Sequence, residues 1–294
     1  MPSLKEVRIR IASVKSTQQI TSAMKMVAAS KLRKAQNSIL KMRPYAAKLK
    51  EILQNLSANA GNTDSNPFAK QRNPNNALIV VFTSNRGLCG AFNSNIIKTS
   101  LQLFNDKFSQ INKENIHFVT IGKKGTEYFT KRNYTVVASH DSIYDALTWE
   151  NTVPIAESLM KLFTDGSYDK IVLVYNQFRN AAVQKTIAES YLPVEAPAQN
   201  DTKPTKSEID YLFEPSKEDI VTELIPKSLK IQFYKALLDS FASEHGARMT
   251  AMHQATDNAG QLLKELSLAY NKARQAAITK EILEIVSGAE ALKG

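Results

Sequence analysis

Residues 4–56 read LKEVRIRIASVKSTQQITSAMKMVAASKLRKAQNSILKMRPYAAKLKEILQNL, and apolar side chains recur there at alternating steps of three and four residues. Thirteen of the sixteen positions reached in this way from Leu4 are apolar. A narrow apolar stripe of this length is typical of a coiled coil, in which two helices bury a shared seam. The stretch therefore predicts one very long helix with a helical partner.

The same spacing returns near the other end of the chain, from Ile220 onward. The polar exceptions on this second stripe are Lys227, His245, Arg248, Lys280 and Ser287. Two such helices in one chain most simply pair with each other, and the course of the chain makes the pair antiparallel. We expect coiled-coil helices at 1–58 and at 216–294.

Prolines and glycines interrupt both predicted helices. Pro44 and Pro226 remove a backbone donor and clash with the preceding turn, so each predicts a bend or a break. Gly246 and Gly260 lower helix propensity, and we expect them to permit the close approach of another backbone. Gly288 is predicted to end the last helix.

The middle of the chain, residues 75–195, shows short apolar runs alternating with helical spacing. This alternation predicts an α/β domain of Rossmann-like type with a largely parallel sheet. The polar stretch 196–215 is predicted to be a linker. Predicted strands lie at 77–83, 117–122, 134–139, 169–178 and 183–194, and predicted helices at 93–108, 126–131 and 152–166.

The net charge of +10 comes from one end of the chain. Residues 1–54 contain twelve Lys and Arg against two acids, whereas the remainder is balanced. A basic helix favours nucleic acid, an anionic membrane surface or an acidic protein partner, although a solvated helix face is the simpler alternative. Tyr45 is the only aromatic residue in 1–56, which weakens the nucleic-acid interpretation.

The segment ITSAMKMVAA (20–29) is apolar or small around most of the helix. One partner helix covers only one side, so this segment is expected to be enclosed by something more. No run of 18 apolar residues predicts a membrane span, and we expect no direct insertion into a membrane.

The loop SNRGLCGAFN (84–93) follows a predicted strand and precedes a predicted helix, as phosphate-binding loops do. It lacks both the Lys-Ser/Thr of a P-loop and the third glycine of a dinucleotide loop, so a structural turn is the favoured interpretation. Cys89, the only cysteine, lies in this loop without a CxxC partner, which favours a buried structural thiol over a nucleophile.

No catalytic, cofactor-binding or metal-binding group is evident in the sequence. The carboxylates of the middle region share no predicted face, and His245 and His253 stand too far apart for a helical metal pair. Polar residues on or near the apolar stripes are the better leads, and they serve either register selection or contact with a surrounding partner. These residues are Arg248, Arg274, Gln275 and Lys280.

Several long motifs resemble the gamma subunits of F-type ATP synthases. They are IRIASVKSTQQITSAMKMVAASKLRKAQ (9–36), SNRGLCGAFN (84–93), YLFEP (211–215), ASEHGARMTAMHQATDNAG (242–260) and LAYNKARQAAITKEILEIVSGAEA (268–291). Because the motifs fall at both ends and in the middle, the resemblance covers essentially the whole chain.

The resemblance implies a non-catalytic central shaft that rotates inside a ring of alpha- and beta-type subunits and couples ion flow to ATP synthesis. It also implies contacts with an epsilon-type subunit and a membrane c-type ring, which the positions Tyr211 and Glu214 match. It implies no cofactor and no nucleic acid partner. Contacts with the catalytic ring are implied at Met24, Lys25, Lys31, Arg33, Arg248, Arg274 and Gln275.

The paired cysteines of plastid members are absent, and no presequence is visible, so we expect a bacterial protein on the cytoplasmic face of the plasma membrane. Two alternatives remain at this point. One is a stand-alone basic coiled coil that binds nucleic acid or anionic membrane. The other is an α/β enzyme that uses the loop at 84–93.

Overall fold

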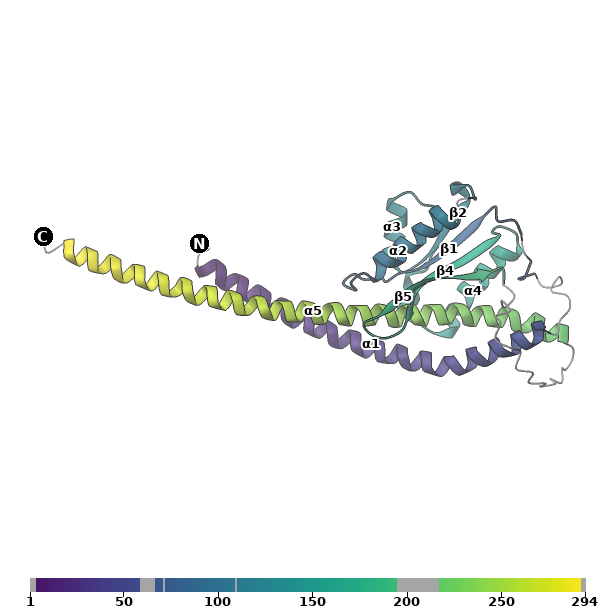
Figure 1. Cartoon of the computed structure of the whole chain (residues 1–294), viewed down its shortest axis with the longest axis horizontal. Coiled ribbons are helices and arrows are strands. Elements are labelled where there is room, and N and C mark those ends of the chain that lie inside the picture. The colour runs from purple at the N-terminus through teal and green to yellow at the C-terminus, as the bar shows by residue number, and fades with distance from the viewer. Residues whose placement is uncertain (1–3, 59–66, 71, 109, 195–216, 292–294) are drawn as a thin grey trace. The chain divides into compact units, whose positions relative to one another are not determined.

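The computed structural model describes residues 4–58, 67–70, 72–108, 110–194 and 217–291, with the backbone alone at 43, 47, 50–58, 107 and 217–222. The chain divides into two compact units, Met1–Ala29 with Arg248–Gly294, and Ser30–Ala247. Helices α1 (Leu4–Ala58) and α5 (Lys217–Ala291) contribute residues to both units (Figure 1). The predicted long terminal helices and central α/β domain are confirmed.

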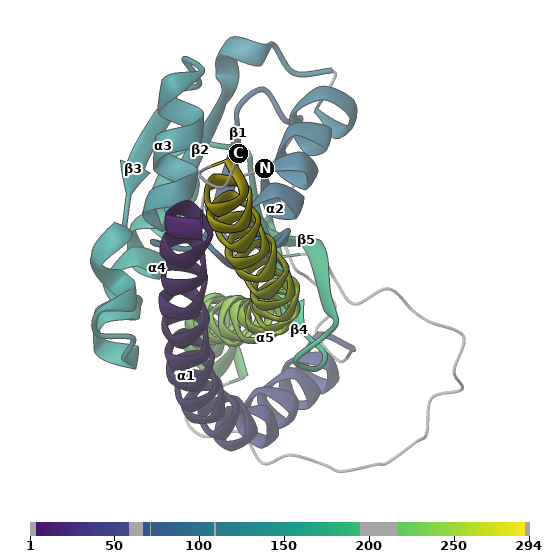
Figure 2. The same ribbon diagram turned by 90° about the vertical axis from the view of Figure 1, so that its left-hand side faces the viewer.

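The first unit is an antiparallel pair of helices (Figures 1 and 2). Cross-helix contacts join Arg8 to Tyr270, Thr21 to Thr256 and Lys25 to His253, and the two residue numbers add up to 277 or 278 each time. A constant sum is the signature of an antiparallel register, which fixes which residues face each other. The predicted apolar stripe of α1 faces its partner, since no stripe position in Leu4–Ala28 is exposed.

The second stripe follows the prediction only in part. Its positions from Met252 to Leu266 are buried or half-buried, but Ala269 and Ala276 are exposed, and their neighbours Tyr270 and Ala277 take the inward positions. The seam thus shifts by one residue near the C-terminus, because a straight helix of 3.6 residues per turn drifts away from a strict 3.5-residue repeat.

Helix α5 extends past the described part of α1. With a pair sum of 278, Leu4, the first described residue of α1, corresponds to Arg274, and α5 continues to Ala291. The seventeen residues 275–291 span about 25 Å at 1.5 Å per residue. Every described residue from 278 to 291 is exposed.

The second unit is built on a five-stranded sheet with strand order β3-β2-β1-β4-β5. The first four strands pair in parallel and β5 is antiparallel to β4, which confirms the largely parallel sheet and the hairpin. The elements are β1 (Ala77–Phe82), α2 (Phe92–Gln102), η1 (Leu103–Lys107), η2 (Lys113–Asn115), β2 (Ile116–Ile121), α3 (Lys123–Lys131), β3 (Val136–Ser139), η3 (Asp141–Tyr144), α4 (Trp149–Thr164), β4 (Lys170–Phe178) and β5 (Gln184–Leu192).

Alternate residues of the buried strands supply two separate cores, as the two-residue period of a strand requires. Leu78, Val80 and Phe82 of β1 pack with α4 and α5, whereas Ile79 and Val81 pack with α2 and α3. The sheet is therefore covered by helices on both faces, which explains why its central strands are continuous apolar runs.

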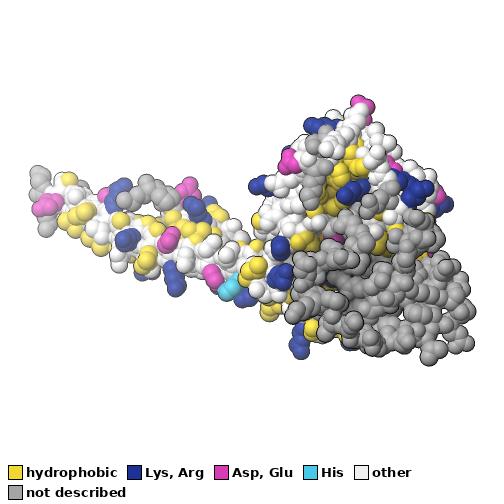
Figure 3. Space-filling view, turned by 45° about the vertical axis from the view of Figure 1, so that its right-hand side comes forward, with side chains coloured by type: hydrophobic (Ala, Val, Ile, Leu, Met, Phe, Trp, Pro, Cys, Tyr) yellow, Lys and Arg dark blue, Asp and Glu magenta, His cyan; other side chains and the backbone are white. Residues whose placement is uncertain are grey.

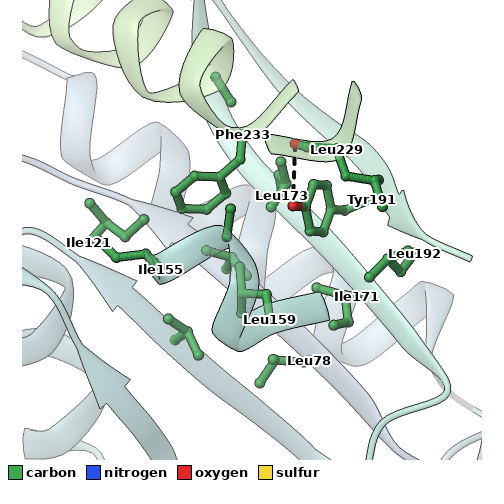
Figure 4. Packing of buried hydrophobic residues seen from close by; sticks show 14 of the residues in the cluster. Leu78, Ile121, Ile155, Leu159, Ile171, Leu173, Tyr191, Leu192, Leu229 and Phe233 are labelled. Atoms are coloured by element: carbon green, nitrogen blue, oxygen red, sulfur yellow. Dashed lines mark hydrogen bonds between the residues drawn. The ribbon is translucent and has the colours of Figure 1, made fainter. Parts of the chain in front are cut away.

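Helix α5 is part of the first of these cores. Leu229, Phe233, Ala236 and Leu237 lie in one cluster with strand residues, and the Phe233 ring centroid is 5.5 Å from that of Phe82 (Figure 4). This stretch of α5 thus packs as a central helix of the α/β domain, which the coiled-coil spacing did not reveal.

Several local expectations need correction. Both long helices continue through Pro44 and Pro226, so neither proline breaks its helix, and of the two expected effects only a bend is left. Gly288 lies inside α5, which ends at Ala291. Helix α3 begins at Lys123 rather than near 126, because Gly122 makes the turn with a φ of 98°.

Both glycines of α5 allow another group to come close, but only Gly246 is approached by another backbone, and that backbone belongs to the sheet domain. A Cβ at Gly246 would lie 3.2 Å from the main-chain oxygen of Ala181, in the β4–β5 turn. A Cβ at Gly260 would lie 3.1 Å from the side-chain nitrogen of Gln18 on α1.

Candidate partner-contact surfaces

The segment 20–29 of α1 keeps an apolar surface outside the helix pair. Ile20, Met26 and Val27 are 57%, 65% and 59% exposed, while Thr21 and Ala28 are buried. The all-round apolar character predicted for this segment is therefore not satisfied within the first unit. Figure 3 shows apolar and charged side chains interspersed along the two-helix rod.

Met24 and Lys25 are half-buried at this level of the rod. The Lys25 ammonium lies 3.3 Å from Nδ1 of His253, whose ring is also 3.4 Å from a carboxylate oxygen of Asp257. Lys25 therefore donates to His253 across the helix pair while the rest of its side chain stays accessible. Met24, in contrast, offers a half-buried apolar side chain.

Lys31 and Arg33 are exposed and flank the buried Leu32, so both basic groups face away from the seam. Both residues belong to the part of α1 that lies in the second unit. Arg274 and Gln275 are also exposed, on the last turns of α5 that face α1. These four side chains are all available to an external partner.

Arg248 differs from the other predicted contacts because it is only 8% exposed. A partner could therefore reach little of its side chain in this conformation. The predicted contacts Tyr211 and Glu214 lie outside the described residues.

The unpaired end of α5, residues 278–291, carries exposed apolar residues that were not among the predicted contact residues. Ile278, Ile282, Leu283, Ile285 and Val286 are between 48% and 71% exposed. Their positions do not share one narrow stripe, so a single partner helix would not cover them all.

The loop 84–93 is held together by its own polar groups. The Ser84 hydroxyl donates to the main-chain oxygen of Arg86, and the Asn93 amide donates to the Ser84 hydroxyl at 2.8 Å and the Cys89 sulfur at 3.3 Å. The main-chain nitrogen of Ser84 donates to Asn93 Oδ1. Asn85 joins the loop to the start of α3 by accepting from the Lys123 nitrogen.

These contacts favour a structural turn, because the polar side chains of Ser84, Asn85 and Asn93 are engaged within the fold. Cys89 is buried, as expected for a structural thiol. Among the described residues, no three His, Cys, Asp or Glu side chains are grouped to hold a metal ion. No helix in the described ranges is long and apolar enough to cross a membrane.

Three buried tyrosines of the second unit carry the clearest electrostatic perturbations. Burial raises the pKa of Tyr144, Tyr175 and Tyr191 above the usual value for a phenol, and the carboxylate of Glu189 adds to the effect at Tyr175. All three stay neutral at physiological pH. The Tyr175 hydroxyl donates to the Glu189 carboxylate, and the Tyr191 hydroxyl donates to the main-chain oxygen of Leu229.

The helix pair thus carries exposed apolar and basic side chains, and the described residues of the α/β domain include no grouped metal ligands. A family model described as ATP synthase matches residues 3–292. The ATP synthase gamma chain of Flavobacterium psychrophilum is 56% identical over 294 residues, which covers 100% of both chains. The chain belongs to the ATP synthase gamma chain family.

Other gamma chains are similar over their full length. Those of Cytophaga hutchinsonii and Chlorobaculum tepidum are 54% and 46% identical, with 99% and 100% of each chain covered. This family membership makes the chain a non-catalytic central-stalk subunit of an ATP synthase, and the stand-alone coiled-coil alternative finds no support.

The solved structures show the same fold. A chain from the central stalk and c-ring of the Tetrahymena thermophila mitochondrial ATP synthase matches with a TM-score of 0.59 and 25% identity, covering 80% of this chain and 99% of that chain. A chain from the Euglena gracilis mitochondrial enzyme matches with a TM-score of 0.68 and 21% identity, covering 98% of this chain and 94% of that chain.

Proposed function

We propose that the rod of this gamma chain turns inside a catalytic head of alpha- and beta-type subunits. The observation that carries the proposal is the unpaired end of α5, where exposed apolar side chains surround a single helix from Ile278 to Val286. A lone apolar helix in water is costly, and a hollow ring of subunits can cover it on every side.

The exposed apolar segment around Met26 on α1 requires a second level of enclosure nearer the middle of the rod. The basic groups Lys25, Lys31 and Arg33 would meet acidic segments of the catalytic subunits there. Arg274 and Gln275 would contact the catalytic ring further along, as hydrogen-bonding groups on an otherwise apolar shaft. Arg248 would join them only if its environment opens.

The segment that contains Tyr211 and Glu214 would meet an epsilon-type subunit and a membrane c-type ring. Solved relatives come from complexes whose descriptions include a c-ring, which supports a contact with such a ring. The subunit would then be a peripheral component on the cytoplasmic face of a bacterial plasma membrane, held there by other subunits.

Reconstitution tests the proposal. The purified chain should show no ATPase activity of its own, but it should restore ATP-driven ion pumping to vesicles that contain a gamma-depleted enzyme. A chain that fails to co-assemble with alpha- and beta-type subunits would overturn the proposal. Binding of nucleic acid by the full chain that is both tight and strongly dependent on salt would instead favour the basic coiled-coil alternative.

A further inference from the structure

The α/β domain and α5 must turn together if the domain is the foot of a rotor. Apolar packing holds a helix in place but is non-directional, whereas hydrogen bonds need particular distances and angles. Hydrogen bonds from one side of α5 to the domain would therefore fix the rotational setting of the helix. The second unit contains such bonds, and they converge on the β4–β5 hairpin.

The first attachment is centred on Asn176 of β4, which is buried. Its main-chain oxygen accepts a 2.9 Å hydrogen bond from the hydroxyl of Ser243 on α5. Its side-chain amide donates to the main-chain oxygen of Phe92, at the start of α2, and its Oδ1 accepts from the hydroxyl of Thr186 on β5. One residue thus ties α5, α2 and both strands of the hairpin together.

The second attachment is centred on Glu189 of β5. One carboxylate oxygen accepts from the Gln232 amide of α5 at 2.9 Å, and the other accepts from the Tyr175 hydroxyl of β4 at 2.5 Å. The same Gln232 amide donates to the main-chain oxygen of Ser190 at 3.2 Å. Nearby, the Tyr191 hydroxyl donates to the main-chain oxygen of Leu229 (Figure 4).

The two attachment points lie on one side of α5. Gln232 and Ser243 are eleven residues apart, which is about three turns and about 16 Å along the helix. Two fixed points on the same side of a rod prevent both rotation about its axis and tilting. The turn of the hairpin adds a steric stop, since the Ala181 backbone sits against Gly246.

We propose that the β4–β5 hairpin is the clamp that transmits torque between the α/β domain and α5, with Asn176, Glu189, Gln232 and Ser243 as positioning residues. The inference deepens the proposed rotor function and rests on it. Apolar packing of Phe233 and its neighbours would keep α5 in the domain without the clamp, but under load the helix would slip against the hairpin.

The first test removes the two polar attachments from α5 in the assembled enzyme. The variant combines Gln232→Ala with Ser243→Ala, and the matched control combines Glu223→Ala with Lys227→Ala, two exposed positions of the same helix. The readout is the ratio of ATP-driven ion pumping to ATP hydrolysis in vesicles. Loss of one hydrogen bond shifts an equilibrium about fivefold, so we expect that ratio to fall about fivefold or more in the variant alone.

A ratio equal to that of the control would overturn the clamp, whereas failure of the unmodified chain to support pumping would overturn the rotor function itself. A variant that does not assemble leaves the second test decisive. Gly246→Cys with Ala181→Cys places two thiols within reach of a disulfide, since a Cβ at Gly246 would be 3.4 Å from the Ala181 Cα. The chain contributes only one other cysteine, the buried Cys89.

Oxidation of this pair should leave pumping and hydrolysis within about twofold of the reduced enzyme, because a clamped helix and hairpin do not move against each other. Loss of pumping on oxidation that is restored by reductant would show that α5 moves relative to the hairpin during the cycle, and would overturn the proposal. The reduced form of the same variant is the control for the substitutions themselves.

Discussion

Replacing Ile282, Leu283 and Val286 together by Ala should weaken the attachment of this chain to the catalytic head without destabilising the chain itself. The three side chains are 55%, 60% and 53% exposed, so the isolated protein derives little stability from them. Surface substitutions of this kind change the free energy of unfolding by about 0.5 kcal/mol or less.

The expected effect on binding follows from the same exposures. Full burial of an Ile, Leu or Val side chain contributes about 1.5–3 kcal/mol, and a little over half of each remains to be covered by a partner. The three truncations together should therefore cost about 3 kcal/mol of binding free energy, which is about 100-fold in the dissociation constant.

The assay is the equilibrium binding of the purified chain to a complex of alpha- and beta-type subunits, with thermal unfolding of the free chain measured in parallel. The matched control replaces Glu281 and Glu284 by Ala, since these side chains are exposed on the same turns but are polar. Equal affinities for the apolar variant and the control would refute the enclosure of this end of α5.

Three further predictions follow from the described contacts. Arg274→Ala with Gln275→Ala should lower the coupling of pumping to hydrolysis while the thermal transition of the chain stays in place, because both side chains are exposed; loss of that transition would show a structural role. Urea unfolding should show constant stability up to about pH 9 and a decline above pH 10, since the neutral phenols of Tyr175 and Tyr191 have raised pKa values in the fold and ionise more readily once unfolded. At pH 11 each of the two tyrosines should lower the free energy of unfolding by about 1.4 kcal/mol relative to pH 8, and unchanged stability would contradict the burial of these phenols. Calorimetric titration of the chain with ATP should show no heat of binding, because the polar groups of the 84–93 loop are engaged within the fold; measurable binding would revive the phosphate-loop interpretation.

The sequence was sufficient to predict the helix pair, because the seam depends only on apolar residues that recur every three or four positions within each helix. Stripe positions of α1 from Val7 to Leu49 are buried or half-buried throughout the described side chains, Lys25 and Gln18 included. The segment 20–29 was expected to be enclosed by more than one partner helix; Met26 is exposed in the free chain, so this enclosure stays a prediction.

The role of α5 within the α/β domain was not predictable from spacing alone. The stripe residues Ile231 and Leu238 are buried, but the α5 residues in the core with the sheet lie off the stripe. They are Leu229, Phe233, Ala236 and Leu237. An apolar stripe of the right period does not by itself show whether the other faces of the helix are also buried. The polar residue Ser243 is buried in this stretch, and its hydroxyl donates to the main-chain oxygen of Asn176 on the sheet.

Local punctuation was also misleading at Gly288 and Pro226. A glycine often ends a helix, but α5 continues through Gly288, where a Cβ would meet no other group within 4 Å. Pro226 lies in the tenth position of α5, where packing of the following residues on the sheet holds the helix together despite the missing donor.

Observation of single assembled molecules tests the central claim most directly. A bead or fluorescent rod attached to the α/β domain of this chain, at an exposed position such as Lys113, would report its motion while the catalytic head is fixed to a surface. The account predicts continuous rotation in one direction when ATP is supplied. A chain that is bound in the complex and stays stationary while ATP is hydrolysed would contradict it.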